Sequence, residues 1–190
     1  MLDALTLLTA DHNRVRGLFS RFGAAKEAGD TEAMAELADL IDTEIEGHTT
    51  IEERVFYPWA RELSEEIAEV VAEGVEEHHV VEVLMGEVRQ LAPGDDEWVA
   101  KLAVVIENVE HHAAEEEEDL FPQVRRAADR GALESVAGDL EAAKRDLGAP
   151  VLADKQDKTT EELHRLATAQ EIPGRSSMGH DELAATVSPG

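Results

Sequence analysis

The chain has 190 residues and contains no cysteine, which excludes disulfides, thiolate zinc sites, iron–sulfur clusters and a cysteine nucleophile. Its formal net charge of -26 argues against nucleic-acid backbones and anionic membranes as partners. Of its 17 basic and 43 acidic residues, four and seven lie in 148–190, so residues 1–147 hold 13 and 36 and form an acidic body. This length indicates one domain with an appendage.

The start of the chain has no feature of a targeting segment. Residues 1–4 lack a basic region followed by a cleavable apolar stretch. No apolar run approaches the roughly 18 residues that a membrane span requires. We therefore expect a cytoplasmic protein that makes no contact with a membrane.

Apolar residues recur at three- and four-residue steps along residues 2–28, which predicts a first helix. Its stripe, interrupted by one histidine, comprises Leu5, Leu8, His12, Val15 and Phe19. Asp30 or Thr31 caps a second helix with a similar stripe. Because proline lacks an N–H and crowds the preceding turn, this second helix should end or kink at Pro58.

Ser64 caps a third helix, and a turn at residues 93–95 separates it from a fourth, which meets Pro122. Short connections between neighbouring helices predict an all-α fold, an antiparallel up-down-up-down four-helix bundle. An extra C-terminal helix near residues 133–147 should pack outside it. The bundle domain is therefore expected to span residues 1–147.

The remaining chain differs in composition from the bundle. Residues 148–158 have the polar composition of a linker, and residues 159–190 predict a small helical tail. This tail is similar to the helical motif of Rho-terminator N-terminal (SAP-like) modules. Acidic residues outnumber basic ones in it, which disfavours nucleic-acid binding. We interpret it as a structural element or as a contact for a protein partner.

A duplicated pattern carries the chemistry of this sequence. One constant offset of 64 relates a His, a Glu and a Pro in two segments, namely His48, Glu52 and Pro58 with His112, Glu116 and Pro122. Each copy follows an upstream histidine, His12 or His78. Positions i and i+4 of a helix lie on one face, so each copy aims an imidazole and a carboxylate at one point.

Four histidines on the apolar faces of four helices need partners for their ring nitrogens, and metal ions would supply them. Their helical neighbours place His78 and His112 inward, and place His79 and His111 on wetter faces, where they are candidates for supporting the ligands. The predicted metal ligands are His12, His48, Glu52, His78, His112 and Glu116.

Two bridging carboxylates and four imidazoles form a natural dinuclear set with open positions. Such a set suits two non-haem iron ions, carboxylate- and oxo-bridged, better than zinc, which prefers closed or three-ligand sites; manganese is the other alternative. Glu53 and Glu117 turn about 100° away on an ideal helix. Their side chains either face solvent or lie behind the ligands and support them; both alternatives are open.

The repeated His-x-x-x-Glu with upstream histidines resembles the haemerythrin-like (HHE cation-binding) family of bacterial type. The resemblance covers about residues 3–125 and includes the Glu-Glu pair and the proline that follow each histidine. It implies a four-helix bundle whose non-haem di-iron centre meets O2, hydrogen peroxide or NO. Respiratory members supply one more histidine where this chain has Glu82, so Glu82 is a candidate catalytic carboxylate near more open irons.

Tyr57, the only tyrosine, is the second candidate catalytic residue. If the helix kinks before Pro58, its phenol reaches the metals as a ligand or proton donor; otherwise it is a boundary residue with its hydroxyl in water. The resemblance favours peroxide disproportionation or defence against oxidative and nitrosative stress, and an O2 or NO sensor or carrier is the alternative. Iron storage ranks third, because ferritin-like proteins use paired Glu-x-x-His motifs and this chain has one, Glu76 to His79.

Overall fold

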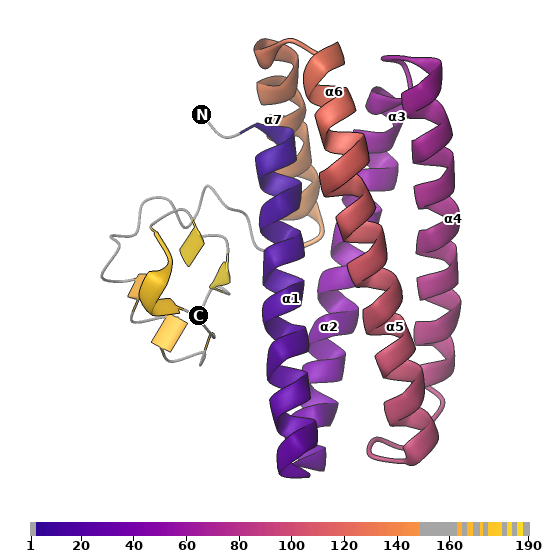
Figure 1. Ribbon diagram of the computed structural model, residues 1–190, viewed down its shortest axis with the longest axis vertical. Helices are drawn as coiled ribbons and strands as arrows, with labels where there is room; N and C mark the ends of the chain where they lie inside the picture. The colour runs from indigo at the N-terminus through magenta and orange to yellow at the C-terminus, as the bar shows by residue number, and fades with distance from the viewer. Residues whose placement is uncertain are drawn as a thin grey trace.

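The structure is a computed structural model, which describes residues 3–148 and, further on, 163–164, 167–168, 172, 175–179, 182–183 and 186–187. The described residues contain helices and no strand. Four long helices run side by side, as Figure 1 shows, and they are α1 (Ala4–Ala28), α2 (Thr31–Ile51), α4 (Glu65–Val88) and α5 (Asp96–Glu115). Each is antiparallel to the next, which confirms the predicted all-α up-down-up-down bundle.

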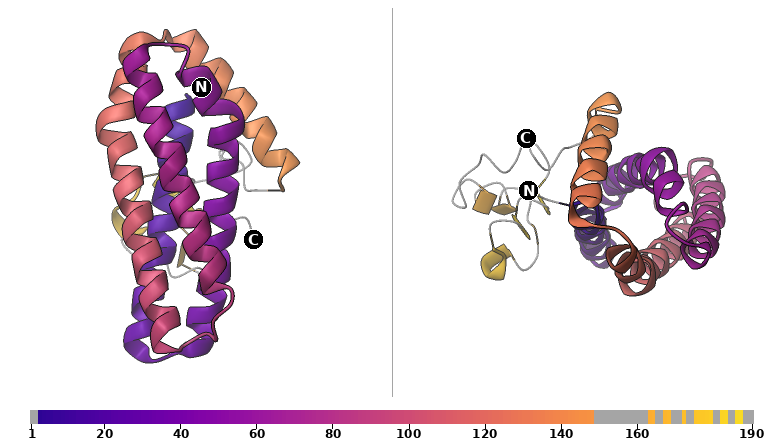
Figure 2. Two further views of the ribbon diagram at one scale, coloured as in Figure 1. Left: turned by 90° about the vertical axis from the view of Figure 1, so that its right-hand side faces the viewer. Right: turned by 90° about the horizontal axis from the view of Figure 1, so that it is seen from above.

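Two short segments extend α2 and α5 past the bundle centre. A π turn, η1 (Glu52–Phe56), joins α2 to α3 (Tyr57–Ala60), and a second π turn, η2 (Glu116–Leu120), joins α5 to α6 (Phe121–Ala127). The predicted extra helix is α7 (Arg130–Asp146), which lies outside the bundle along α1 and α2 (Figure 2).

The π turns show how the chain passes the two prolines, at the first of which the second helix was expected to end or kink. The second helix does not end at Pro58, because the N–H of Tyr57 donates to the carbonyl of Glu52 and the chain stays helical to Ala60. Phe121 donates to Glu116 in the same way ahead of Pro122. Each π turn begins at a glutamate that the sequence predicts as a metal ligand, and such turns are frequent at functional sites.

Side-chain caps fix where the helices begin. Asp30 accepts a hydrogen bond from the N–H of Ala33 at 3.0 Å, and Ser64 accepts one from Ile67 at 3.2 Å. Both caps were predicted from the sequence, with Thr31 as the alternative at the first. Gly29 adopts the left-handed conformation, φ 68°, that ends α1. Local capping residues therefore determine where these helices begin.

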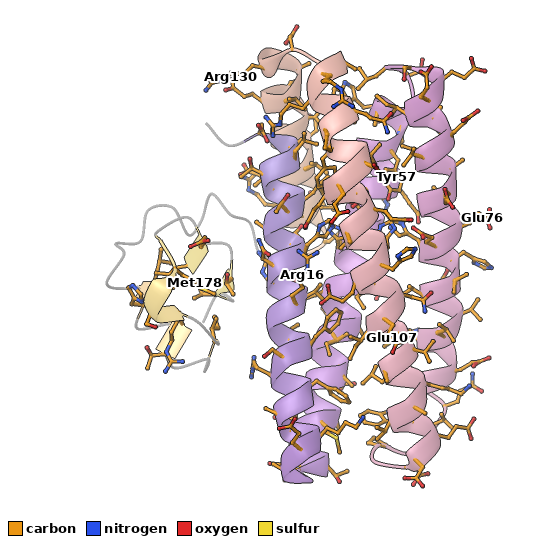
Figure 3. All side chains as sticks on the ribbon, in the orientation of Figure 1. Arg16, Tyr57, Glu76, Glu107, Arg130 and Met178 are labelled. Atoms are coloured by element: carbon orange, nitrogen blue, oxygen red, sulfur yellow. The ribbon has the colours of Figure 1, made fainter. Side chains whose placement is uncertain are left out.

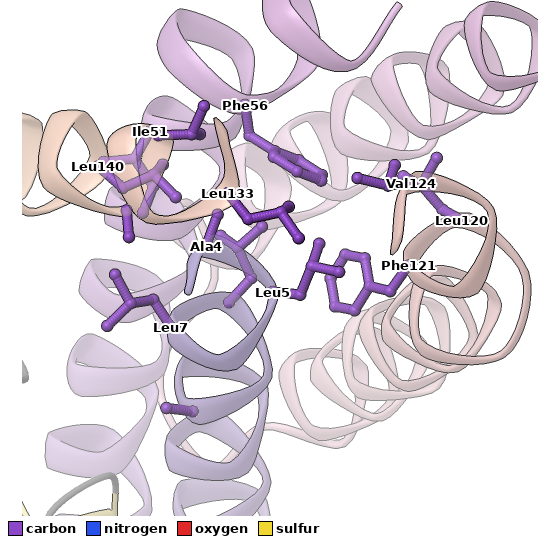
Figure 4. Packing of buried hydrophobic residues seen from close by; sticks show 14 of the residues in the cluster. Ala4, Leu5, Leu7, Ile51, Phe56, Leu120, Phe121, Val124, Leu133 and Leu140 are labelled. Atoms are coloured by element: carbon purple, nitrogen blue, oxygen red, sulfur yellow. The ribbon is translucent and has the colours of Figure 1, made fainter. Parts of the chain in front are cut away.

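Two apolar clusters fill the bundle, one toward each end. The first includes Ala4, Leu5, Leu7, Ile51, Phe56, Leu120, Phe121, Val124, Leu133 and Leu140 (Figure 4). The second lies toward the α1–α2 and α4–α5 turns and includes Phe19, Phe22, Ile41, Met85, Trp98 and Leu102. Along α1, Leu8 belongs to the first cluster and Val15 to the second, with His12 between them. A polar layer is therefore enclosed by apolar packing on both sides.

Most of the segment after α7 lies outside the described residues. These include nearly all of the predicted linker 148–158 and most of the predicted tail helices near 160–169 and 181–187. The described tail residues, among them the single turn η3 (Arg175–Ser177), lie beside α1 (Figure 1). In the described part of the chain, no helix is long and apolar enough to cross a membrane.

Candidate metal centre

The polar layer consists of the six residues that the sequence predicted as metal ligands. Each of the four helices supplies one histidine, and η1 and η2 supply the glutamates at their first positions. All six are buried except His48, which is half-buried; the exposed fraction of Glu52 is 0% and that of Glu116 is 3%. Carboxylates in an apolar interior are costly unless they are paired or bind a metal.

His12 and His48 form what we term the N-terminal half-site. Their Nε2 atoms lie 3.1 Å apart. Oε2 of Glu116 lies 3.2 Å from Nε2 of His12, and Oε2 of Glu52 lies 3.2 Å from Nε2 of His48. The ligand atoms of these four residues all lie within 4.8 Å of one another, so one cation could contact them all.

His78 and His112 form the C-terminal half-site, and their Nε2 atoms lie 3.0 Å apart. The Oε2 atom of Glu52 that contacts His48 also lies 3.4 Å from Nε2 of His78. Oε2 of Glu116 lies 3.8 Å from Nε2 of His112. Each glutamate thus faces one histidine from either half-site, so each would be placed to share cations bound in both.

The glutamate oxygens provide a test of whether metal ions fit here. Within the described part of the chain, both oxygens of Glu52 and Oε2 of Glu116 are buried and accept no hydrogen bond. Buried carboxylate oxygens that accept no hydrogen bond are rare in proteins and need an explanation. A layer of imidazole nitrogens and such carboxylate oxygens, 3.2–3.8 Å apart, matches the mixed donors of a transition-metal site in a helical bundle. The residues present therefore fit a pair of metal ions.

A second layer of carboxylates lies behind the four histidines. The Nδ1 atoms of His12, His78 and His112 lie 2.8, 3.0 and 2.7 Å from Glu117, Glu53 and Glu77, respectively. Nδ1 of His48 lies 3.5 Å from Oδ2 of Asp11. A carboxylate that accepts the Nδ1–H leaves the Nε2 lone pair directed at the centre and makes the imidazole a stronger ligand.

This arrangement raises the pKa values of His12, His48 and His78. Burial lowers the pKa of His48, but the carboxylates of Glu52 and Asp11 outweigh it and raise the pKa to about 10. Burial also lowers the pKa values of His12 and His78, and neighbouring glutamates again raise both above the usual value. The metal-free centre therefore holds extra protons, which metal binding must displace.

The carboxylate behind His48 is itself held by two cations. Burial raises the pKa of Asp11, but Lys144 from α7, His48 and Arg14 outweigh it and hold the pKa well below its usual value. Nη1 of Arg14 donates to Oδ1 of Asp11 at 2.9 Å, and Nζ of Lys144 also contacts Asp11. Only 4% of Lys144 and 6% of Asp11 is exposed, so α7 completes the N-terminal half-site from outside the bundle.

Tyr57 points into the bundle, whereas Glu76 and Glu107 extend away from it (Figure 3). Its hydroxyl donates to Oε1 of Glu116 at 3.0 Å and lies 3.4 Å from Nε2 of His78 and 3.5 Å from that of His112. Burial, Glu52 and Glu116 raise the pKa of the phenol well above 10.0, so it stays protonated. The alternative of a boundary tyrosine with its hydroxyl in water is wrong.

Gly74 makes room for the Tyr57 ring. A Cβ at this position of α4 would lie 2.9 Å from the Tyr57 hydroxyl, closer than real Cβ contacts. In the sequence repeat, the upstream histidines His12 and His78 are 66 residues apart, and by this offset Gly74 corresponds to Leu8. The His-x-x-x-Glu segments are 64 residues apart, and by this offset Tyr57 corresponds to Phe121. Phe121 stacks on His12 with ring centroids 5.9 Å apart, and Tyr57 stacks on His78 at 5.4 Å. The two halves thus differ by a hydroxyl and by the small residue that admits it.

Three predicted positions lie away from the centre. Glu82 does not approach the layer: its side chain is 80% exposed and its nearest ion-pair partner is His79 at 3.9 Å. Val81 and Met85 take the inward positions of this stretch of α4, which turns Glu82 outward. His79 and His111 are also exposed and support no ligand in the layer.

Asp11 and Glu77 were missed by the sequence analysis, and for Glu53 and Glu117 it left the supporting role open. A signal was present, because an acidic residue precedes both upstream histidines (Asp11-His12 and Glu77-His78) and a second glutamate follows both ligand glutamates. Each of these acids supports a histidine of a neighbouring helix rather than its own. Sequence adjacency alone does not reveal that exchange.

A small cavity adjoins the four histidines on the side of the second apolar cluster. Its volume is about 30 Å³. The lining combines the four imidazoles with apolar side chains of each long helix, namely Val15, Ile45, Val81 and Val109. The half-buried Glu44 and Thr49 of α2 also line it. A cavity of this volume holds about one water molecule, so it suits a ligand of two or three non-hydrogen atoms.

Fold and centre together define a helical bundle with a buried cation-binding cluster of histidines and glutamates. The family model of the Hemerythrin HHE cation binding domain matches residues 3–124. The chain therefore belongs to the haemerythrin-like family, as the sequence pattern indicated. Helix α7 and the tail lie beyond the matched residues. No curated protein and no solved structure gave a significant match.

Proposed function

We propose that this chain is a non-haem di-iron protein that reacts with small oxidants, above all by disproportionating hydrogen peroxide. The proposal rests on one observation: a protonated phenol lies inside the layer, with its hydroxyl 3.0 Å from Glu116. A reversible carrier of O2 needs no proton donor at this place. Conversion of peroxide to water does need protons at the reacting oxygens.

The ligands of the two irons would be His12, His48, Glu52, His78, His112 and Glu116, and manganese or zinc are the less favoured metals. When bound, the metal pair supplies exchange of electrons with the oxidant. Overall, two molecules of hydrogen peroxide give two of water and one of O2, so protons and electrons balance within the substrate.

The chain's own residues would hold and move the protons. Tyr57 keeps its proton because burial and the nearby Glu52 and Glu116 raise the pKa of its phenol. Its hydroxyl lies within 3.5 Å of Nε2 of both histidines of the C-terminal half-site. The cavity of about 30 Å³ beside the four imidazoles has room for a molecule as small as peroxide, O2 or NO, and Tyr57 lies outside its lining. Apolar packing on both sides keeps bulk water away from the layer.

The Tyr57→Phe variant tests this role. It removes one hydroxyl and keeps the ring that stacks on His78, so the metal content should stay the same. We expect peroxide turnover to fall by about 100-fold or more, as for removal of a general acid. Unchanged turnover at unchanged metal content would contradict the proposal. A phenolate-to-iron charge-transfer band that disappears in this variant would instead assign Tyr57 as a ligand.

A binding role without turnover, as an O2 or NO sensor or carrier, is the second candidate. It is supported by the tail, because a Cβ at Gly17 of α1 would lie 3.7 Å from the Thr186 methyl group. Gly17 is five residues from His12, so the tail could report the state of the centre to a protein partner. A reversible O2 spectrum without peroxide turnover would favour this candidate. We further propose that the protein is cytoplasmic and that the bundle domain ends at residue 147 and the linker at residue 158.

A further inference from the structure

A second group of possible cation ligands lies on the surface between α4 and α5. Glu77, His111 and Glu115 offer ligand atoms that all lie within 4.8 Å of one another. His111 is 67% exposed and its Nε2 atom lies 3.3 Å from Glu115. Among the described residues, no lysine or arginine forms an ion pair with Glu77 or Glu115. Their ion-pair partners are histidines, His112 for Glu77 at 2.7 Å and His111 for Glu115 at 3.3 Å.

A narrow cavity connects this surface group with the buried layer. Its volume is about 20 Å³, room for a single water molecule. Glu77 and Glu115 line it together with Tyr57, His112 and Glu116 of the centre.

Gly74 also lines this cavity, and a Cβ there would come within 3.3 Å of His112 Cε1 as well as meeting the Tyr57 hydroxyl. The missing side chain at position 74 thus keeps the connection open.

The inner end of the cavity presents an unsatisfied ligand atom. Glu116 lines it, is 3% exposed, and its Oε2 atom accepts no hydrogen bond from the described residues. Glu77 spans both ends, because it belongs to the surface group and also contacts Nδ1 of His112 at 2.7 Å. Carboxylate and imidazole ligands are therefore available from the surface to the layer.

We propose that Glu77, His111 and Glu115 form an entry site, where a divalent cation such as Fe²⁺ binds first and from which it passes through the cavity to Glu116 and His112. This inference rests on the proposed function, because it requires that the layer holds metal ions. The C-terminal half-site is the first to receive a cation by this route. Two half-buried carboxylates and one exposed imidazole would bind a cation weakly enough to release it inward.

The test compares loading rates of the metal-free full chain, with Co²⁺ as a probe whose visible absorption reports binding. The variant His111→Ala/Glu115→Gln removes two entry ligands and leaves Glu77 with His112. Its matched control is His79→Ala/Glu82→Gln, an exposed His–Glu pair of α4 that lines neither cavity. We expect the entry-site variant to load about tenfold more slowly than the wild type, with the same final cobalt content.

The control variant should load at the wild-type rate. Equal loading rates for the entry-site variant and the wild type would overturn the entry site. Failure of the wild type itself to bind cobalt in the layer would instead overturn the proposed metal centre, so the two failures are distinguishable.

Discussion

The two half-sites come from one repeated pattern but have different surroundings. In the N-terminal half-site, the supporting carboxylates are neutralised by cations: Arg14 and Lys144 hold Asp11, and Arg16 donates to Glu117 at 2.8 Å. In the C-terminal half-site, no lysine or arginine of the described residues pairs with Glu53 or Glu77. The repeat therefore specifies the ligands, while residues outside it set the charge around each metal.

A second difference lies in the aromatic residue over each upstream histidine. Phe121 covers His12, whereas Tyr57 covers His78 and adds a hydroxyl that reaches Glu116. We infer that proton-dependent chemistry belongs to the C-terminal half-site. The more negative surroundings there would also favour the higher oxidation state of a metal ion bound in this half-site.

The largest effect is expected from Glu52→Gln, because Glu52 faces histidines of both half-sites. Loss of its charge should reduce metal binding in both, so that the metal content falls below one ion per chain. Glu53→Gln is the matched control: it removes only the support behind His78, and about 10- to 100-fold weaker binding in one half-site is expected. Metal analysis of both variants checks this, and full occupancy of Glu52→Gln would show that it does not bridge.

Lys144→Met tests the contribution of α7. The change leaves the buried Asp11 carboxylate with one cation fewer, which should lower the free energy of unfolding by about 3–5 kcal/mol. Metal loss should follow in the N-terminal half-site only. Arg130→Met, an exposed residue of the same helix, should leave stability nearly unchanged (Figure 3). Denaturant titrations of both variants measure the difference. Equal stabilities would show that Lys144 does not stabilise the fold through Asp11.

The pKa of His48 predicts that stability depends on pH in the metal-free protein and not in the metal-bound protein. Because its folded-state pKa is raised from 6.5 to about 10, the protonated imidazole stabilises the metal-free fold below pH 6.5, and this contribution is lost as the pH rises through about 10. Metal-free protein should therefore lose stability between pH 7 and 10. Metal-bound protein should not, since bound imidazole carries no such proton. Thermal unfolding of both forms across this range provides the measurement.

Gly74→Ala should have the smallest effect on stability. The added methyl group would meet the Tyr57 hydroxyl at 2.9 Å and should cost about 1–3 kcal/mol. Because the hydroxyl must move, we also expect lower peroxide turnover than in the wild type. Gly86→Ala, on the same helix with nothing within 4 Å of the added atom, is the control. Equal unfolding temperatures for both variants would show that Tyr57 does not need the space at Gly74.

The bundle and the six converging side chains followed from the sequence because helical periodicity and the repeat fix them directly. The inward turn of Tyr57 did not, since it depends on a π turn at Glu52 that propensity does not encode. The contact of Lys144 with Asp11 could not be predicted for another reason, because the two residues are 133 positions apart in the sequence. Glu82 was misplaced because family spacing was applied to a helix whose inward positions are Val81 and Met85.

The most direct test of the central claim is the metal content of anaerobically purified protein, with absorption spectra before and after addition of O2 and then peroxide. The account predicts two irons per chain, spectral change on oxidation and catalytic loss of peroxide. Two manganese ions per chain would support the dinuclear centre but show that its metal is manganese. No bound metal, or a single tightly held zinc ion, would contradict the dinuclear iron centre.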